Sequence, residues 1–120
     1  MSQEIEITDM QEFQKIREKL FNLNRNLNTI KQKIQYTDKD RQRCLITVKD
    51  LDSLPSSTKT YKSVGKMFIV APLDTLKKDL KKQAEKDEED VKGLMNQGKY
   101  LDAQITETEK SLKELMISKK

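Results

Sequence analysis

Few residues in this chain could do chemistry. Its 120 residues include no histidine and one cysteine, Cys44. A lone cysteine cannot form a disulfide within the chain, and without a second Cys or any His a multi-ligand His/Cys metal site is excluded. A reactive thiol needs surroundings that lower its pKa, and the sequence shows none. We therefore expect Cys44 to be a small buried core residue.

Acidic pairs and glycines are the other candidates for a reactive site. Glu88 and Glu89 lie in the mixed-charge run 77–90, which is typical of a solvated helix face rather than a general acid–base pair. Gly93 and Gly98 lack the pattern of a phosphate-binding loop. No nucleophile has an identifiable base. The sequence therefore predicts no enzyme, no cofactor and no bound metal.

Composition points instead to long helices. Apolar residues make up 34% of the chain and charged residues 37%, with 24 basic and 20 acidic side chains giving a net charge of +4. Sustained periodicity in so polar a chain is typical of extended helices. The two signs alternate, whereas a segregated basic stripe would indicate nucleic acid as a main partner.

Targeting signals are absent from the pattern. No apolar run reaches the length of a membrane span. The first nine residues lack the basic and apolar regions of a signal peptide. With one cysteine and no such signals, we expect a reducing intracellular location, the cytoplasm first and the nucleus as a second compartment, and no membrane partner.

The first half of the chain carries a heptad stripe with spacings of three and four, which predicts a coiled-coil helix over residues 8–54. Capping pairs at Thr8 and Asp9 predict its start, and Leu54-Pro55 predicts its end. The stripe consists of Phe13, Ile16, Leu20, Leu23, Leu27, Ile30, Ile34, Thr37, Arg41, Cys44, Val48 and Leu51.

The second half carries a matching stripe, which predicts a second coiled-coil helix over residues 72–118. Pro72 suits the first turn of a helix, where its missing N–H costs nothing. The stripe consists of Leu73, Leu76, Leu80, Ala84, Asp87, Val91, Leu94, Gly98, Leu101, Ile105, Thr108, Leu112 and Leu115.

Between the two helices the chain reverses over residues 59–70. β-Branched and aromatic residues there favour strands over Lys59–Val64 and Met67–Val70. Gly65 at the first of two loop positions predicts a type II′ turn. The fold class is mostly α: one domain, residues 1–120, in which a long antiparallel two-helix coiled coil has its arms joined by one β-hairpin.

One register of the two arms sets Leu23 opposite Ile105 and Leu27 opposite Leu101. The same register sets Arg41 opposite Asp87, so the two charged residues of the stripes are expected to pair. We call the line along which the two stripes pack the seam. A lone charge buried in the seam would be costly.

The hairpin is expected to be an assembly surface. A two-stranded hairpin is marginal alone, and both of its edges are open to further pairing. Met67–Val70 is apolar on both faces and lies beyond the end of the coil, so hairpin-to-hairpin pairing between subunits is the economical way to cover it. The predicted assembly residues are Tyr61, Val64, Gly65, Met67, Phe68, Ile69 and Val70.

The free ends of the two helices form the other candidate site, here called the tip. Phe13, Leu112 and Leu115 are expected to complete the coil. The remaining apolar residues are better placed to contact a partner, because methionine suits adaptable apolar binding. The candidate tip residues are Ile5, Ile7, Met10, Phe13, Leu112, Leu115, Met116 and Ile117.

The sequence of the predicted hairpin resembles that of a known protein family. Residues 61–69 read YKSVGKMFI, which is similar to the prefoldin pattern of an aromatic residue followed by Val-Gly-basic-Met-Phe-aliphatic. A single hairpin between two arms resembles the β-type subunits, since α-type subunits carry two. The resemblance covers almost the whole chain.

This resemblance implies a heterohexamer, in which the chain has two α-type and three further β-type partners. The hairpins would form a double β-barrel platform, and coiled coils would project from it. The tips would hold unfolded proteins, notably actin and tubulin, without ATP, and the complex would pass them to the cytosolic chaperonin. A structural coiled-coil adaptor that binds no client and, less favoured, a nucleic-acid-binding helical hairpin stay open as alternatives.

Overall fold

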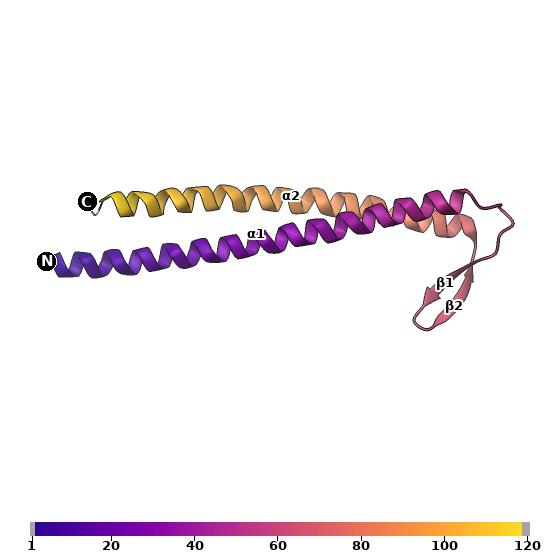
Figure 1. The fold of residues 1–120 in the computed structure, drawn as a ribbon, viewed down its shortest axis with the longest axis horizontal. Helices are drawn as coiled ribbons and strands as arrows, with labels where there is room; N and C mark the ends of the chain where they lie inside the picture. The colour runs from indigo at the N-terminus through magenta and orange to yellow at the C-terminus, as the bar shows by residue number, and fades with distance from the viewer. Residues whose placement is uncertain (1, 119–120) are drawn as a thin grey trace. The chain divides into compact units, whose positions relative to one another are not determined.

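The computed structural model describes the backbone of residues 2–118 and the side chains of residues 10–116. Four elements follow one another: helix α1, Ser2–Asp52; strand β1, Thr60–Val64; strand β2, Met67–Ala71; and helix α2, Leu73–Ser118 (Figure 1). The predicted fold of two long helices joined by one two-stranded antiparallel hairpin is confirmed.

The element bounds differ from the expected ones mainly at the start of α1. The helix begins at Ser2 rather than near Thr8, so the capping pairs at Thr8 and Asp9 lie inside it. Residues 1–9 contain neither proline nor glycine, and a capping preference alone does not stop a helix that can continue. At the other end, backbone bonds from Ser53 to Asp50 (3.3 Å) and from Leu54 to Leu51 (3.1 Å) form a last tight turn before Pro55.

The chain falls into two compact units: Met1–Lys33 with Leu94–Lys120, and Ile34–Gly93. In the first unit the core consists of Leu23, Leu27 and Ile105, with Leu20 and Leu101 packed against it. Leu23 and Leu27 belong to α1 and Ile105 to α2, so this unit is an antiparallel pair of helical segments, as the predicted register requires.

The second unit contains the hairpin and the helical segments next to it. Its buried apolar residues are Cys44, Val48, Leu73 and Ala84. The Lys77 ammonium lies 3.1 Å from the Asp52 carboxylate and so links the start of α2 to the end of α1.

Both predicted stripes coincide with the less exposed side of their helices. Every stripe position named above, from Phe13 to Leu51 and from Leu73 to Leu115, is buried or half-buried. The heptad spacing therefore identified the contact face of each helix correctly. Within residues 2–118, neither helix contains an apolar stretch long enough to cross a lipid bilayer.

The hairpin turn has the predicted form. Val64 pairs with Met67, which leaves a two-residue loop of Gly65 and Lys66. Gly65 has a φ of 62°, and it is the only residue with positive φ among those described. A type I′ turn would need positive φ at both loop positions, so the geometry agrees with type II′.

Candidate functional site

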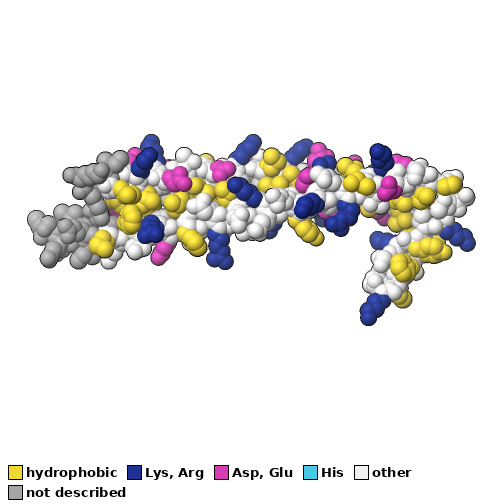
Figure 2. All heavy atoms as spheres, viewed as in Figure 1, with side chains coloured by type: hydrophobic (Ala, Val, Ile, Leu, Met, Phe, Trp, Pro, Cys, Tyr) yellow, Lys and Arg dark blue, Asp and Glu magenta, His cyan; other side chains and the backbone are white. Residues whose placement is uncertain are grey.

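The β-hairpin presents an uncovered apolar surface. All ten residues from Tyr61 to Val70 are exposed, and Phe68 keeps 75% of its surface accessible. The predicted assembly residues all lie in this segment. Hydrophobic side chains are visible on the hairpin in Figure 2. Their role in assembly stays a prediction, and its physical basis is the free energy gained when such surface is removed from water.

Within the part of the chain that the structure describes, both edges of this sheet are open. β1 and β2 pair only with each other, from Thr60 opposite Ala71 to Val64 opposite Met67. The Thr60 hydroxyl also donates to the Ala71 carbonyl at 2.6 Å, which ties the base of the hairpin. The outward-facing N–H and C=O groups of both strands can therefore pair with strands of other subunits.

The tip residues separate into two groups, as expected. Phe13, Leu112 and Leu115 are half-buried and belong to the contact face of the helices. Met10 is 62% exposed and Met116 is 55% exposed, so both are free to contact a partner. The side chains of the other three candidates, Ile5, Ile7 and Ile117, lie outside the described residues.

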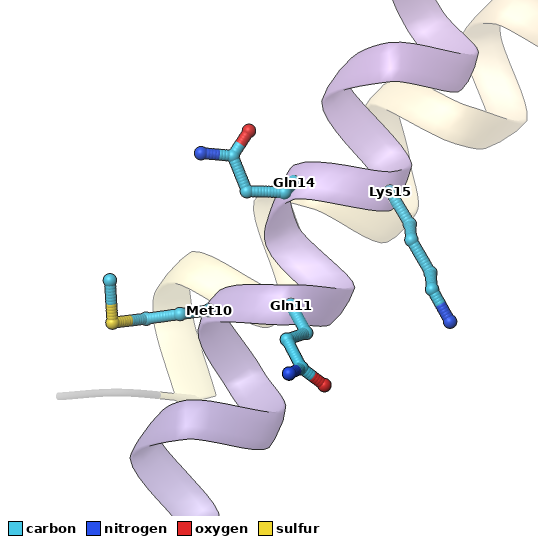
Figure 3. Close-up of a pocket in the computed structure, with 4 residues that line it drawn as sticks. All are labelled: Met10, Gln11, Gln14 and Lys15. Carbon is cyan, nitrogen blue, oxygen red and sulfur yellow. The ribbon is translucent and has the colours of Figure 1, made fainter.

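Two open depressions involve the exposed methionines. One has a volume of about 460 Å³ and is lined by Met10, Gln11, Gln14 and Lys15, which project from neighbouring turns of α1 (Figure 3). The other, of about 560 Å³, lies on α2 and is lined by Thr106, Glu109, Lys110, Leu112, Lys113 and Met116. Each offers apolar area with polar groups at its margin, which suits weak contact with an exposed apolar segment.

Arg41 and Asp87 do not form the predicted ion pair. Arg41 Nε donates to Asp38 Oδ1 at 2.9 Å, and no ion pair joins Arg41 to Asp87. The prediction was wrong because the seam register fixes backbone positions, whereas a long arginine side chain can choose a partner one turn away on its own helix.

Asp87 is instead buried beside two groups of α1. One oxygen of Asp87, one oxygen of Asp40 and the Cys44 sulfur all lie within 4.8 Å of one another. Asp87 Oδ1 accepts from Gln83 Nε2 at 3.0 Å, whereas its Oδ2 is buried with no hydrogen-bond partner. A hydrogen bond between the two carboxyls would require that one of them keeps its proton.

The pKa values in this layer follow from its burial and its negative charge. Burial raises the pKa of the Asp87 carboxyl and the Asp40 carboxyl raises it further, while the hydrogen bond from Gln83 opposes the rise. Burial also raises the pKa of the Cys44 thiol, and the two nearby carboxylates add to that rise. Cys44 is thus the buried core residue that the sequence predicted. Its proximity to two carboxylates was missed, although the four-residue spacing from Asp40 and the register with Asp87 contain that signal.

Charge is interspersed along the helices. Figure 2 shows Lys or Arg side chains next to Asp or Glu side chains over the visible face, without a continuous basic stripe there. A backbone-binding nucleic-acid surface would gather positive charge along one groove or face. The visible distribution therefore favours a solvated coil.

The two long helices carry one hairpin between them, and that hairpin has an apolar surface and two open edges. These features define a class of protein, namely the subunit of a larger assembly. The chain belongs to the prefoldin family: the family model described as "Prefoldin subunit" matches residues 14–119. Prefoldin subunits are non-enzymatic components of a chaperone, so the chain is not an enzyme, and membership implies assembly with other prefoldin subunits.

Individual relatives agree with this family. The chain is 60% identical to probable prefoldin subunit 1 of Dictyostelium discoideum over 96% of this chain and 100% of the relative. It is 30% identical to prefoldin subunit 1 of Arabidopsis thaliana over 87% and 81%. The prefoldin beta subunit from Thermococcus strain KS-1 has the same fold, with a TM-score of 0.76 and 21% identity over 86% and 90%. The expected likeness to β-type subunits, and among them to eukaryotic subunit 1, is confirmed.

Proposed function

We propose that this chain is one subunit of a hexameric, ATP-independent holdase, and that its tip contacts unfolded proteins. The observation that carries the proposal is the exposure of Met10 and Met116 near the free ends of α1 and α2. A client would gain weak apolar contacts at several arms at once, and such contacts add up through effective concentration. Actin and tubulin are the proposed clients, and the cytosolic chaperonin is the proposed recipient.

Assembly through the hairpin is part of the same proposal. The hairpins of two neighbouring subunits would pair with the open edges of β1 and β2, and two α-type and three further β-type subunits would complete the β-barrel platform. The run Met67–Val70 supports this arrangement, because a strand that is apolar on both faces is stable only when both are covered. We also propose the cytoplasm as the main location, with the nucleus as a second one.

The test compares hexamers that differ only in this subunit. Met10→Glu and Met116→Glu, made together, place charge at the tip without lowering helix propensity. Met95→Glu is the matched control, because Met95 is 51% exposed on the same helix as Met116, about six turns earlier. The readout is the ratio of hexamer to chemically unfolded actin that halves light scattering on dilution.

We expect the tip variant to need a several-fold higher ratio and the Met95 variant to behave as wild type. Native mass spectrometry should show intact hexamers in all three cases, so that loss of assembly does not imitate loss of binding. If the tip variant suppresses aggregation as well as wild type does, this subunit is a structural adaptor and the other subunits hold the client.

A further inference from the structure

One buried layer of the second unit carries three potential metal ligands. Asp40 and Cys44 lie one turn apart on α1, and Asp87 reaches them from α2. The Cys44 and Asp87 side chains are buried, with exposed fractions of 6% and 4%. Arg41, the charged residue of the α1 stripe, is engaged by Asp38 on its own helix.

The unsatisfied oxygen of Asp87 is the second observation. Its Oδ2 atom is inaccessible to solvent and accepts no hydrogen bond, whereas Oδ1 accepts from Gln83. Buried acceptors are nearly always paired, so an orphaned one needs an explanation. The Asp40 carboxyl can donate to Asp87 only while one of the two carboxyls keeps its proton, so this oxygen has no strong donor once both are ionised.

We propose that Asp40, Cys44 and Asp87 bind a divalent transition-metal ion of the zinc type, which links α1 to α2. Thiolate and carboxylate together favour a borderline ion such as Zn²⁺ over Mg²⁺ or Ca²⁺, which take oxygen ligands alone. Water would occupy the fourth position. An ion held by Asp87 Oδ2 would also give that atom the hydrogen-bond or ligand partner that it lacks.

The geometry needs only a small adjustment to hold such an ion. Zinc–ligand distances of about 2.0–2.3 Å in a tetrahedron place the ligand atoms about 3.3–3.8 Å apart. The three atoms already lie within 4.8 Å of one another, so rotamer changes of the side chains close the difference. Gln83, which donates to Asp87, would orient the ligating carboxylate from outside, as hydrogen-bonded groups around metal ligands commonly do.

Binding has a defined proton balance. The thiol enters protonated and leaves its proton to solvent when the sulfur coordinates the metal, and a carboxyl that holds a proton releases it in the same way. No electron is transferred, and a water molecule completes the coordination. Metal binding should therefore release protons and tighten as the pH rises.

The experiment titrates Co²⁺ into the full chain after treatment with a reductant and removal of metal with a chelator. A thiolate-to-cobalt charge-transfer band, saturating at one ion per chain and reversed by added Zn²⁺, is the expected result. Cys44→Ser should abolish the band, and Asp87→Asn should raise the dissociation constant more than tenfold. Asp79→Asn, which removes an exposed carboxylate of α2, is the control and should bind as wild type.

A second readout keeps the proposal testable if a variant folds poorly. Zn²⁺ should raise the melting temperature of the wild-type chain and leave that of Cys44→Ser unchanged, with helix content checked by circular dichroism. Cobalt that binds without a charge-transfer band, or that binds equally to wild type and Cys44→Ser, would show adventitious binding by surface carboxylates and overturn the proposal. A wild-type chain that zinc does not stabilise would overturn it as well.

Discussion

Asp87→Asn should stabilise the metal-free chain at neutral pH, although most substitutions of buried residues destabilise. The amide has nearly the same shape as the carboxyl. Its oxygen can keep the hydrogen bond from Gln83, and its nitrogen can donate to Asp40. The substitution thus removes one negative charge from a buried layer and supplies a donor where two acceptors meet.

The size of the effect follows from the orphaned oxygen. A buried acceptor without a partner costs about 1–3 kcal/mol. The layer is only two helices thick, and water close by on either side weakens the penalty, so the lower part of that range applies. We expect a gain of about 1–2 kcal/mol in the free energy of unfolding, at roughly 3–5 °C in melting temperature per kcal/mol for a chain of this length.

The pH dependence gives the prediction a second signature. Burial, with the Asp40 carboxyl close by, raises the native pKa of Asp87 above the ordinary value for an aspartate. Its contribution to stability is therefore fully present in acid, where the group is protonated in both the folded and the unfolded chain, and is lost as the pH rises through the native pKa. The advantage of Asp87→Asn should therefore be small in acid and should grow as the pH rises above the range in which carboxyl groups ordinarily titrate.

Urea unfolding in buffer with a chelator measures the difference, and the chelator separates it from any effect of bound metal. Asp79→Asn changes the net charge equally at an exposed position of α2, and should alter stability little at any pH. If Asp87→Asn is less stable than wild type at neutral pH, then the carboxylate has a favourable partner in solution, and the reasoning from its burial and neighbours is refuted.

Two further predictions concern a helical glycine and the hairpin. Gly98→Ala should stabilise the chain by about 1 kcal/mol through helix propensity, because the added methyl would lie at an ordinary contact distance of 3.8 Å from Ile30. Gly93→Ala is the comparison without packing, since a methyl there would meet nothing within 4 Å. Thermal unfolding measures the stability of both variants. Phe68→Glu should leave the fold of the single chain intact yet prevent hexamer formation, as read by native mass spectrometry, whereas Lys66→Glu in the exposed turn should still assemble.

Much of the fold was predictable because its signals are periodic. A heptad pattern fixes which face of a helix is buried, and it placed even polar residues such as Thr108 and Asp87 correctly in the seam. Glycine at the first loop position specified the turn for an equally local reason, since that position requires positive φ.

The predictions that were wrong concern details that the heptad pattern does not determine. Arg41 has enough rotatable bonds to reach Asp38 on its own helix, so seam register alone could not assign its partner. The helix α1 could begin at a capping residue or continue further towards the N-terminus. Sequence preferences that differ by only a fraction of a kcal/mol do not decide between these two starts. At the tip, the pattern separated Phe13 from Met10 correctly by exposure, but what Met10 binds is a property of the client.

The position of the hairpin between the helices also has a consequence for synthesis. Each residue of α1 in the core, such as Leu23, has its partner in α2, and Ile105 is made only after most of the chain has left the ribosome. Until then the apolar side of α1 is bare. This subunit is proposed to bind unfolded proteins. During most of its own translation it is itself a chain with an exposed apolar helix face.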